Sequence, residues 1–315
     1  MTKKHDIIWL ESVDSTNKEA IRRISDIDNL SVLSAIEQTS GRGQRGNTWT
    51  SAPGENLTFS IVMKFSGTPD TNSGCQPYMK AHDQFVLNEI ASVSVAEFLA
   101  SYGIRAMIKW PNDIYAGSKK ICGILIENSL RGSHISSSII GIGLNVSQRN
   151  FDVNLINPTS MVLCTGSSVN SEASAGGQFD IRQCLSEFME IFNAHVERFL
   201  SGNPEESATR SYDSLRKIYL SRLWRLNETA RFIDYTTLPS GHNDGPMNPC
   251  MTGSESSAYG LPTEHSLSTD LPTDFDGRKF TGIIRGLSPI GHLLVEDTEK
   301  GELKEFSFKE IGYIL

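Results

Sequence analysis

Apolar and polar positions along the 315-residue chain follow two periods, and each period predicts a different kind of element. Alternation, or a short apolar run between turn residues, predicts strands at 7–10, 31–37, 57–63, 104–110, 121–127 and 135–146. Helical spacing predicts helices at 18–24, 84–102, 178–200 and 207–226, and Gly103 closes the second of them.

The residue composition of the chain changes after residue 236. Residues 237–276 contain no lysine or arginine and are rich in proline, serine and threonine, so they carry too little apolar area to offset the entropy of ordering. Short strands are predicted before and after this segment, at 230–236, 279–287, 292–296, 303–306 and 311–314. We therefore expect a catalytic-type domain at 1–226 and a small β-barrel at 227–315, interrupted by an acidic insertion at about 237–276.

Composition limits the classes of protein to which the chain can belong. With 38% hydrophobic and 21% charged residues it is a globular protein, and a net charge of -8 argues against a general DNA-binding role. The five cysteines are scattered without a C-x-x-C pair, which predicts neither a disulfide framework nor a zinc site. No signal peptide or membrane-length apolar run is recognised. We expect a cytoplasmic protein that does not associate with membranes.

A glycine- and arginine-rich stretch, Gly41 to Trp49, is the strongest candidate for chemistry. Its glycines let the backbone approach an anion, and Arg42 and Arg45 could bind that anion bidentately. The stretch lacks the spacing of a Walker loop. Taken alone, it predicts either a phosphate-binding loop or a basic surface turn.

Three further motifs have a structural and a functional interpretation each. Asp14 to Asn17 is either a helix cap or a cap that also holds a ligand. Lys109 to Asp113 ends a strand at Pro111, and Lys119-Lys120 could form a charged hairpin tip. Together with the arginines, these residues supply what ATP-dependent activation of a carboxylate needs: cations for phosphates, a carboxylate for Mg²⁺ and a lysine near the α-phosphate. Trp49 could stack on a purine or belong to the core.

Five motifs in one order resemble those of the biotin-protein ligases, the biotin–[acetyl-CoA-carboxylase] ligases. They are D-S-T-N at 14–17, Q-x-x-G-R-G-x-R-G at 38–46, K-W-P-N-D at 109–113, K-x-x-G-I-L at 120–125 and G-x-G-x-N at 141–145. The resemblance implies an α+β fold: a class II synthetase-like catalytic domain, with a mixed or antiparallel sheet and flanking helices, followed by a small SH3-like barrel at the C-terminus. It also implies a Mg²⁺- and ATP-dependent ligase that forms biotinyl-5′-AMP and then biotinylates a lysine of a biotin carboxyl carrier domain.

The resemblance assigns a role to each site residue. It implies catalytic roles for Lys120 and Arg42, and a biotin site formed by Ser15, Thr16, Asn17, Gln38, Gly41, Arg42, Lys120, Gly123 and Gly141. It implies ATP or adenylate contacts from Arg42, Gln44, Arg45, Trp49, Lys109, Asn112 and Asn145, and Mg²⁺ ligation by Asp113 and Asn112. A homodimer is a further possibility.

The chain departs from the family pattern at two positions, and two other functions remain as alternatives. Gln44 stands where some relatives have arginine, so retention of the intermediate is expected either to be weaker or to rely more on Arg42 and Arg45. Cys122 stands where a small residue such as alanine is common and is expected to be a buried, inert thiol. The chain begins at the first strand of the catalytic domain, so a repressor role is not expected. The rivals are a lipoate-protein ligase or octanoyltransferase of the same fold, and a non-enzymatic biotin-sensing protein.

Overall fold

The computed structural model describes residues 6–67, 77–166, 179–200, 208–236 and 277–314. The predicted insertion at about 237–276 lies outside the described residues. The chain divides into two compact units, one of Met1–Leu226 with Pro289–Gly291 and one of Asn227–Ser288 with His292–Leu315. Each unit has its own sheet.

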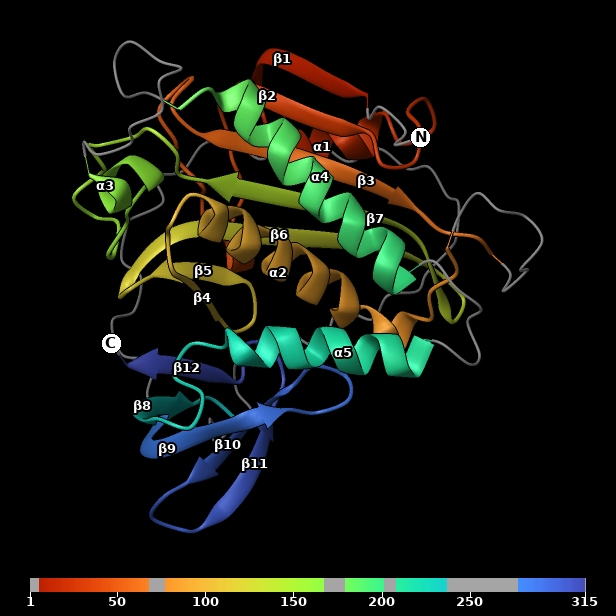
Figure 1. Ribbon diagram of the computed structural model, residues 1–315. Coiled ribbons are helices and arrows are strands. Elements are labelled where there is room, and N and C mark those ends of the chain that lie inside the picture. Colours follow the sequence, from red (N-terminus) through yellow and green to blue (C-terminus); the bar gives the residue numbers. More distant parts are fainter. Residues whose placement is uncertain (1–5, 68–76, 167–178, 201–207, 237–276, 315) are drawn as a thin grey trace, which may run out of the picture. The chain divides into compact units, whose positions relative to one another are not determined.

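The first unit is built on a seven-stranded mixed sheet (Figure 1). In order across the sheet its strands are β1 Ile7–Val13, β2 Val32–Gln38, β3 Leu57–Lys64, β7 His134–Leu144, β6 Lys119–Arg131, β5 Asp113–Ala116 and β4 Ala106–Lys109. β1 and β2 are parallel because helix α1, Thr16–Arg22, connects them; all other neighbours are antiparallel. The α+β class with a mixed sheet is confirmed.

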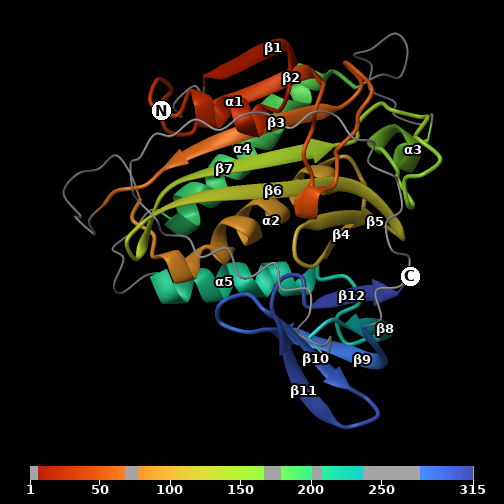
Figure 2. The ribbon, with the colours of Figure 1, turned by 180° about the vertical axis from the view of Figure 1, so that it is seen from behind.

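Helices cover both faces of this sheet (Figures 1 and 2). α2 Phe85–Ser101 and α4 Ile181–Leu200 pack on one face, and α1 lies on the other. α5 Ala208–Ser221 contacts both α2 and α4, and the short helix α3 is Met161–Thr165. Alternation along β3 explains the two-sided burial, because Phe59 turns towards Phe188 of α4 (ring centroids 5.3 Å apart) while Ser60 faces α1.

The structure differs from the sequence-based expectations at three short elements. The sequence pattern favours a turn after Pro111, where the structure has β5, because four residues are too few to display an alternating pattern. α3 is equally short, and no pattern predicts it. The apolar stripe of α1 is narrower than its sequence predicts, since Ala20 is buried but Ile21 is 47% exposed.

The second unit contains five antiparallel strands. They are β8 Thr229–Asp234, β9 Arg278–Leu287, β10 Leu293–Asp297, β11 Glu302–Phe306 and β12 Ile311–Ile314, in the order β11-β10-β9-β8-β12. The expected strands are therefore present, but no ladder joins edge strands β11 and β12 among the described residues, so the sheet is open. The expected closed barrel is not confirmed.

A buried carboxyl group on α2 gives the first unit a pH-dependent stability. Glu89 contacts Arg216 of α5 and is completely buried. Burial raises the pKa of Glu89 from 4.5 to about 7, against the opposing attraction of Arg216. The folded protein then keeps a proton that the unfolded chain has lost, so this stabilisation is complete below pH 4.5 and disappears as the pH rises through about 7.

We therefore expect wild-type stability to fall with rising pH more steeply than that of Glu89→Gln. Relative to the variant, the free energy of unfolding should fall by up to about 3 kcal/mol between about pH 5 and about pH 8, as urea titrations would measure. Glu190→Gln, at an exposed position of α4, is the control and should follow the wild type. Parallel pH profiles for the wild type and Glu89→Gln would contradict the assignment.

Candidate functional site

One face of the seven-stranded sheet is paved with small side chains, and the predicted motifs meet on it. Two rows of directly paired residues cross the strands on this face: Thr58, Gly143, Gly123 and Asp113 form one, and Ser60, Gly141 and Leu125 form the other. Directly paired residues of antiparallel strands turn their side chains to the same face. The glycines leave room above the sheet, and two segments fill it: the start of α1 and the Gly41 to Trp49 loop.

In the D-S-T-N motif, Asp14 is partly exposed to solvent, whereas Ser15, Thr16 and Asn17 are buried. Asp14 accepts hydrogen bonds from the backbone of Ser15 and from Arg22, and the Arg22 guanidinium holds the pKa of the Asp14 carboxyl far below its usual range. Ser15 is the N-cap residue, but its side chain makes no capping bond. Thr16 and Asn17 are buried inside the first turn of the helix. The motif therefore does more than cap a helix: it directs polar side chains inward.

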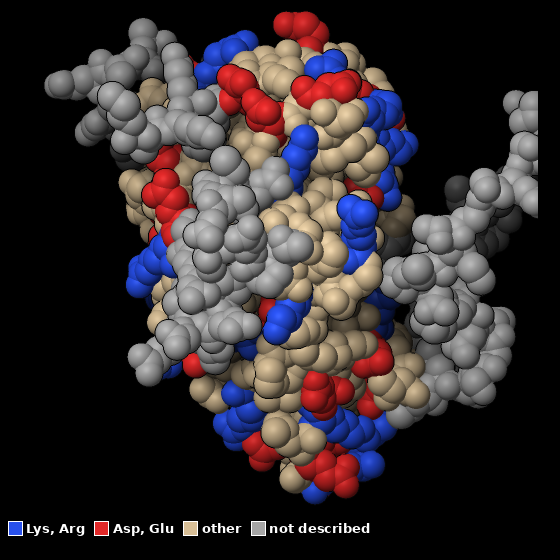
Figure 3. Space-filling view, turned by 90° about the vertical axis from the view of Figure 1, so that its right-hand side faces the viewer, with Lys and Arg blue, Asp and Glu red and all other residues tan. Residues whose placement is uncertain are grey.

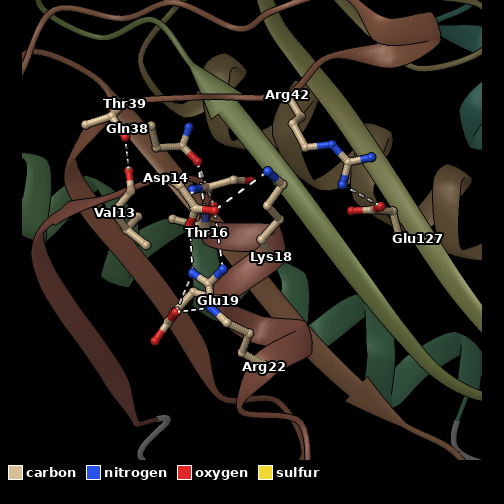
Figure 4. Close-up of polar contacts among 11 residues, drawn as sticks. Val13, Asp14, Thr16, Lys18, Glu19, Arg22, Gln38, Thr39, Arg42 and Glu127 are labelled. Atoms are coloured by element: carbon tan, nitrogen blue, oxygen red, sulfur yellow. Dashed lines mark hydrogen bonds and ion pairs between the residues drawn. The ribbon is translucent and has the colours of Figure 1, made fainter. Parts of the chain in front are cut away.

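Those inward side chains form a connected polar cluster with β2 and β3, and Figure 4 draws the part formed by Thr16 and Gln38. Gln38 Oε1 accepts from the backbone N of Thr16 at 2.8 Å, and Ser60 Oγ lies 2.8 Å from Thr16 Oγ1. Ser60 Oγ also lies 2.6 Å from Asn17 Oδ1. Gly141 lies beneath Asn17, and a Cβ at Gly141 would overlap the Asn17 amide. The cluster could bind a small ligand that carries both hydrogen-bond donors and acceptors.

The Gly41 to Trp49 loop folds back on itself over the glycine row. Gly43 N donates to Asn47 O at 2.7 Å, Trp49 N donates to Gly41 O at 3.0 Å, and a bridge joins Arg42 to Thr48. Gln44 opens a single 3₁₀ turn, and the side chain of Arg45 lies outside the described structure.

Trp49 anchors the loop on the sheet. Its ring lies directly on Gly143, where a Cβ would overlap it, and 3.1 Å from the position that a Cβ of Gly123 would occupy. The indole N–H of Trp49 is buried and has no hydrogen-bond partner among the described residues. A buried donor without a partner costs free energy, which is typical of a group that serves a ligand.

Arg42 reaches from the loop to strand β6 (Figure 4). Its Nη1 lies 2.9 Å from Glu127 Oε1, and Asn17 Nδ2 donates to the other oxygen of the same carboxylate at 2.8 Å. One carboxylate thus connects the loop to the start of α1. The Arg42 side chain is 42% exposed and the Glu127 side chain 27% exposed, so both can be approached from solvent.

Charged residues gather at the other end of the glycine row. Lys120 Nζ lies 2.7 Å from Asp113 Oδ1 and 5.8 Å from the centroid of the Trp49 ring. Lys109 bonds to Tyr115 Oη at 3.2 Å. Burial lowers the pKa of Lys109; the charge of Asp113 opposes this shift, and the charges of Lys120 and Arg225 add to it. The group supplies cations and one carboxylate for a polyanionic ligand.

Three predicted residues make internal contacts here. The buried amide of Asn112 donates to Ile124 O, and that of Asn145 donates to Thr159 O at 2.9 Å. Both hold strand ends that border the charged group. Cys122 is completely buried, so its expected burial is confirmed, and burial raises the pKa of its thiol, as expected for an inert cysteine.

Sequence reasoning did not single out Ser60 and Glu127. The alternation of side-chain faces along a strand could have indicated both residues. Ser60 is one of three polar positions in an otherwise apolar strand, and Glu127 is four residues after Gly123 on one strand, hence on the same face. Neither position stands out until its neighbours in space are known.

Residues 9–145 match the model of the biotin/lipoate A/B protein ligase family. Residues 9–145 are therefore similar to this family, and we call them the ligase-family domain. The match covers the start of α1, the loop, the charged group and β7, which are the segments that build the candidate site. The ligase-family domain accounts for all five motifs.

Curated relatives of the ligase-family domain include bifunctional ligase/repressor BirA of Escherichia coli, 30% identical over 149 residues (47% of this chain and 43% of BirA). The biotin–[acetyl-CoA-carboxylase] ligase of Paracoccus denitrificans is 29% identical over 137 residues (44% of this chain and 53% of that protein). This chain therefore spans about half the length of the curated relatives it matches. The fold is similar to that of biotin protein ligase from Aquifex aeolicus in complex with biotin and ATP: TM-score 0.61, 24% identity, covering 98% of this chain and 97% of that one.

The described part of the chain shows no sign of a metal cluster, a membrane-spanning helix or, on the face drawn in Figure 3, a broad basic surface. No group of three or more His, Cys, Asp and Glu side chains there could hold a metal ion by itself. None of the described helices combines the length and apolar character needed to cross a membrane. On the face drawn in Figure 3, the described Lys and Arg side chains are interspersed with Asp and Glu, so that face offers no broad basic surface.

Proposed function

We propose that this protein is an ATP-dependent biotin-protein ligase. In the first step a carboxylate oxygen of biotin attacks the α-phosphorus of ATP, the bond to the β-phosphate breaks, and biotinyl-5′-AMP and pyrophosphate form. In the second step a lysine amine of a biotin carboxyl carrier domain attacks the acyl carbon. AMP then leaves, and the amine gives up a proton. The observation that carries the proposal is that one sheet face bears both a buried polar cluster and the Lys120–Asp113 pair, with glycines between them.

The two ends of the face suit the two substrates. The polar cluster of Ser15, Thr16, Asn17 and Gln38 would hold the ureido ring of biotin, whose buried polar atoms need partners. Gly41, Gly123 and Gly141 would border biotin by letting Trp49 and Asn17 pack closely around its site. Lys120 would stabilise charge on the reacting carboxylate and α-phosphate, and Arg42 would turn from Glu127 to the same charges.

The nucleotide would lie towards the charged group. Trp49 supplies a flat ring, and Lys109 and Lys120 supply phosphate contacts. Asn112 and Asn145 border this region through the strand ends that they fix, and Gln44 and Arg45 would approach from the loop.

Asp113 fits a Mg²⁺ ion that is held mainly by phosphates. Mg²⁺ in such sites takes one or two carboxylates, with phosphate oxygens and water as its other ligands, and Asp113 is a partly exposed carboxylate beside two lysines. The Asn112 amide nitrogen donates to Ile124 O, so only its oxygen could serve an ion. When bound, the ion would neutralise charge on the phosphates.

The domain division is part of the proposal. Residues 1–226 would be the catalytic domain, and residues 227–315 an SH3-like barrel interrupted at about 237–276. One aromatic contact supports a curved sheet: Phe280 of β9 packs on Phe306 of β11 although β10 lies between these strands, whereas Phe232 packs on Tyr313 of its direct neighbour β12. Phe232 and Phe280 also pack on each other, so both edge strands share one core.

The test is a pair of assays on the full chain. Biotin-dependent exchange of labelled pyrophosphate into ATP reports the first step, and transfer of labelled biotin to a carrier domain reports the second. Both should require Mg²⁺, and lipoate should not replace biotin. Activity with lipoate alone would favour a lipoate ligase, and ATP-independent transfer from an added octanoyl thioester would favour an octanoyltransferase. Biotin binding without exchange would favour a biotin sensor.

A further inference from the structure

Glu127 is the branch point of the polar cluster. One carboxylate oxygen accepts from Asn17 Nδ2 at 2.8 Å, and the other lies 2.9 Å from Arg42 Nη1. A carboxylate paired with a guanidinium accepts hydrogen bonds and donates none. The NH₂ group of Asn17 must therefore face Glu127, where it also lies 3.3 Å from Leu125 O.

This orientation fixes the next bond in the cluster. With its NH₂ towards Glu127, Asn17 turns Oδ1 towards Ser60 Oγ, 2.6 Å away. An amide oxygen can only accept, and a serine hydroxyl has a single hydrogen, so Ser60 gives that hydrogen to Asn17. The second close contact of Ser60, 2.8 Å to Thr16 Oγ1, then requires Thr16 to be the donor.

The direction of the bonds extends to Gln38. With its hydrogen on Ser60, Thr16 Oγ1 keeps its lone pairs, and its 3.2 Å separation from Gln38 Oε1 is long for a hydroxyl hydrogen bond. Gln38 Oε1 instead accepts from the backbone N of Thr16. The Gln38 NH₂ group lies on the side of Gly41, 3.2 Å from where a Cβ of Gly41 would be.

We propose that Glu127 and Ser60 are positioning residues that set which groups of this site donate and which accept. The bonds run in one direction, from Thr16 through Ser60 and Asn17 to Glu127, and leave an acceptor at Thr16 and a donor at Gln38. A cyclic urea, with N–H donors and a carbonyl acceptor, needs both. This inference rests on the proposed function, because biotin carries that ring. Without the Glu127 carboxylate, only the 3.3 Å contact with Leu125 O holds the Asn17 amide in this orientation, and a half-turn of the amide would reverse the bonds of Ser60 and Thr16.

Glu127→Gln tests the proposal with little change of shape. Its dissociation constant for biotin, measured by calorimetry, should rise about tenfold, the equivalent of one lost hydrogen bond. The KM for ATP should change less than twofold. Ser60→Ala removes the relay by deleting one oxygen and should weaken biotin binding similarly. Glu296→Gln is the matched control: Glu296 also pairs with an arginine, at 2.6 Å and 35% exposure, but in the second unit.

A charge swap separates orientation from simple loss of the Arg42 partner. Asn17→Asp alone places two carboxylates together and should weaken biotin binding more than Glu127→Gln does. In the variant that combines Asn17→Asp with Glu127→Gln, the new amide at position 127 can donate to the new carboxylate at position 17. The other oxygen of that carboxylate accepts from Ser60, so the bonds from Thr16 to Ser60 and from Ser60 to position 17 keep their original direction, and only the bond between positions 17 and 127 is reversed. The biotin affinity of this double variant should come within about threefold of the wild type. If the two substitutions acted independently, the affinity would instead be lower by the product of the two fold-losses of the single variants.

The outcomes distinguish this inference from the proposed function. A wild type that binds no biotin overturns both. A wild type that binds biotin, with Glu127→Gln and Ser60→Ala unchanged, overturns only the positioning role. A double variant as weak as the product of its single variants also overturns it, because independent contacts would combine in that way. Retained thermal midpoints identify the variants that have kept the fold.

Discussion

Lys120→Ala is expected to abolish most biotin-dependent pyrophosphate exchange while leaving the fold intact. Lys120 lies at the start of β6, 2.7 Å from Asp113 and beside the Trp49 ring. A preorganised cation beside the developing charge is worth about 10²–10³ in kcat, by analogy with the loss of one oxyanion-stabilising donor. The Lys120 and Asp113 side chains are 32% and 29% exposed, and such a pair contributes at most about 1 kcal/mol to stability.

The neighbouring lysine provides the control for Lys120. Lys119 is exposed on the same strand, so Lys119→Ala changes the net charge equally without touching the candidate site. It should keep at least about half of the wild-type exchange rate, as expected for a surface substitution away from the site. If both variants lost activity equally, a general effect of charge would replace the catalytic role of Lys120. Full exchange by Lys120→Ala would remove the basis for the assignment.

Gly143→Ala should displace Trp49 and open the loop that carries Arg42. The added methyl group would overlap the indole ring, and because β7 is a central strand its backbone cannot yield. The side chain that moves must then be Trp49, and the bridge of its neighbour Thr48 to Arg42 should move with it. We expect biotinyl-adenylate formation to fall about a hundredfold, as observed generally when substrate-positioning groups are displaced by about 1 Å.

Intrinsic tryptophan fluorescence and exchange assays together would check this prediction. The emission of Trp49 should shift to the red in Gly143→Ala, because its ring would leave the sheet for solvent. The difference spectrum should vanish when Gly143→Ala is compared with the wild type in a Trp49→Phe background. Wild-type activity in Gly143→Ala would mean that the loop adapts without consequence.

Local sequence determined most of the scaffold and the residues from which the candidate site is drawn. Alternation and helical spacing depend only on residues close together in the sequence. The strands at 32–38 and 57–64 and the helix at 85–101 were therefore predictable to within a few positions. Motif order was sufficient to predict the ligase family. The glycine- and arginine-rich composition of Gly41 to Trp49 is sufficient to indicate a loop that could bind an anion.

The tertiary structure alone decided which of those residues meet. Asn17 and Glu127 are separated by 110 positions and touch only because α1 lies over β6 and β7. Trp49 was equally compatible with a core position and a stacking surface, and its place on Gly143 follows from sheet pairing. Register across a sheet depends on contacts distant in sequence, so no local pattern reveals it. The sequence therefore determined the chemical groups of this protein, whereas the sheet determined their neighbours and the direction of the hydrogen bonds between them.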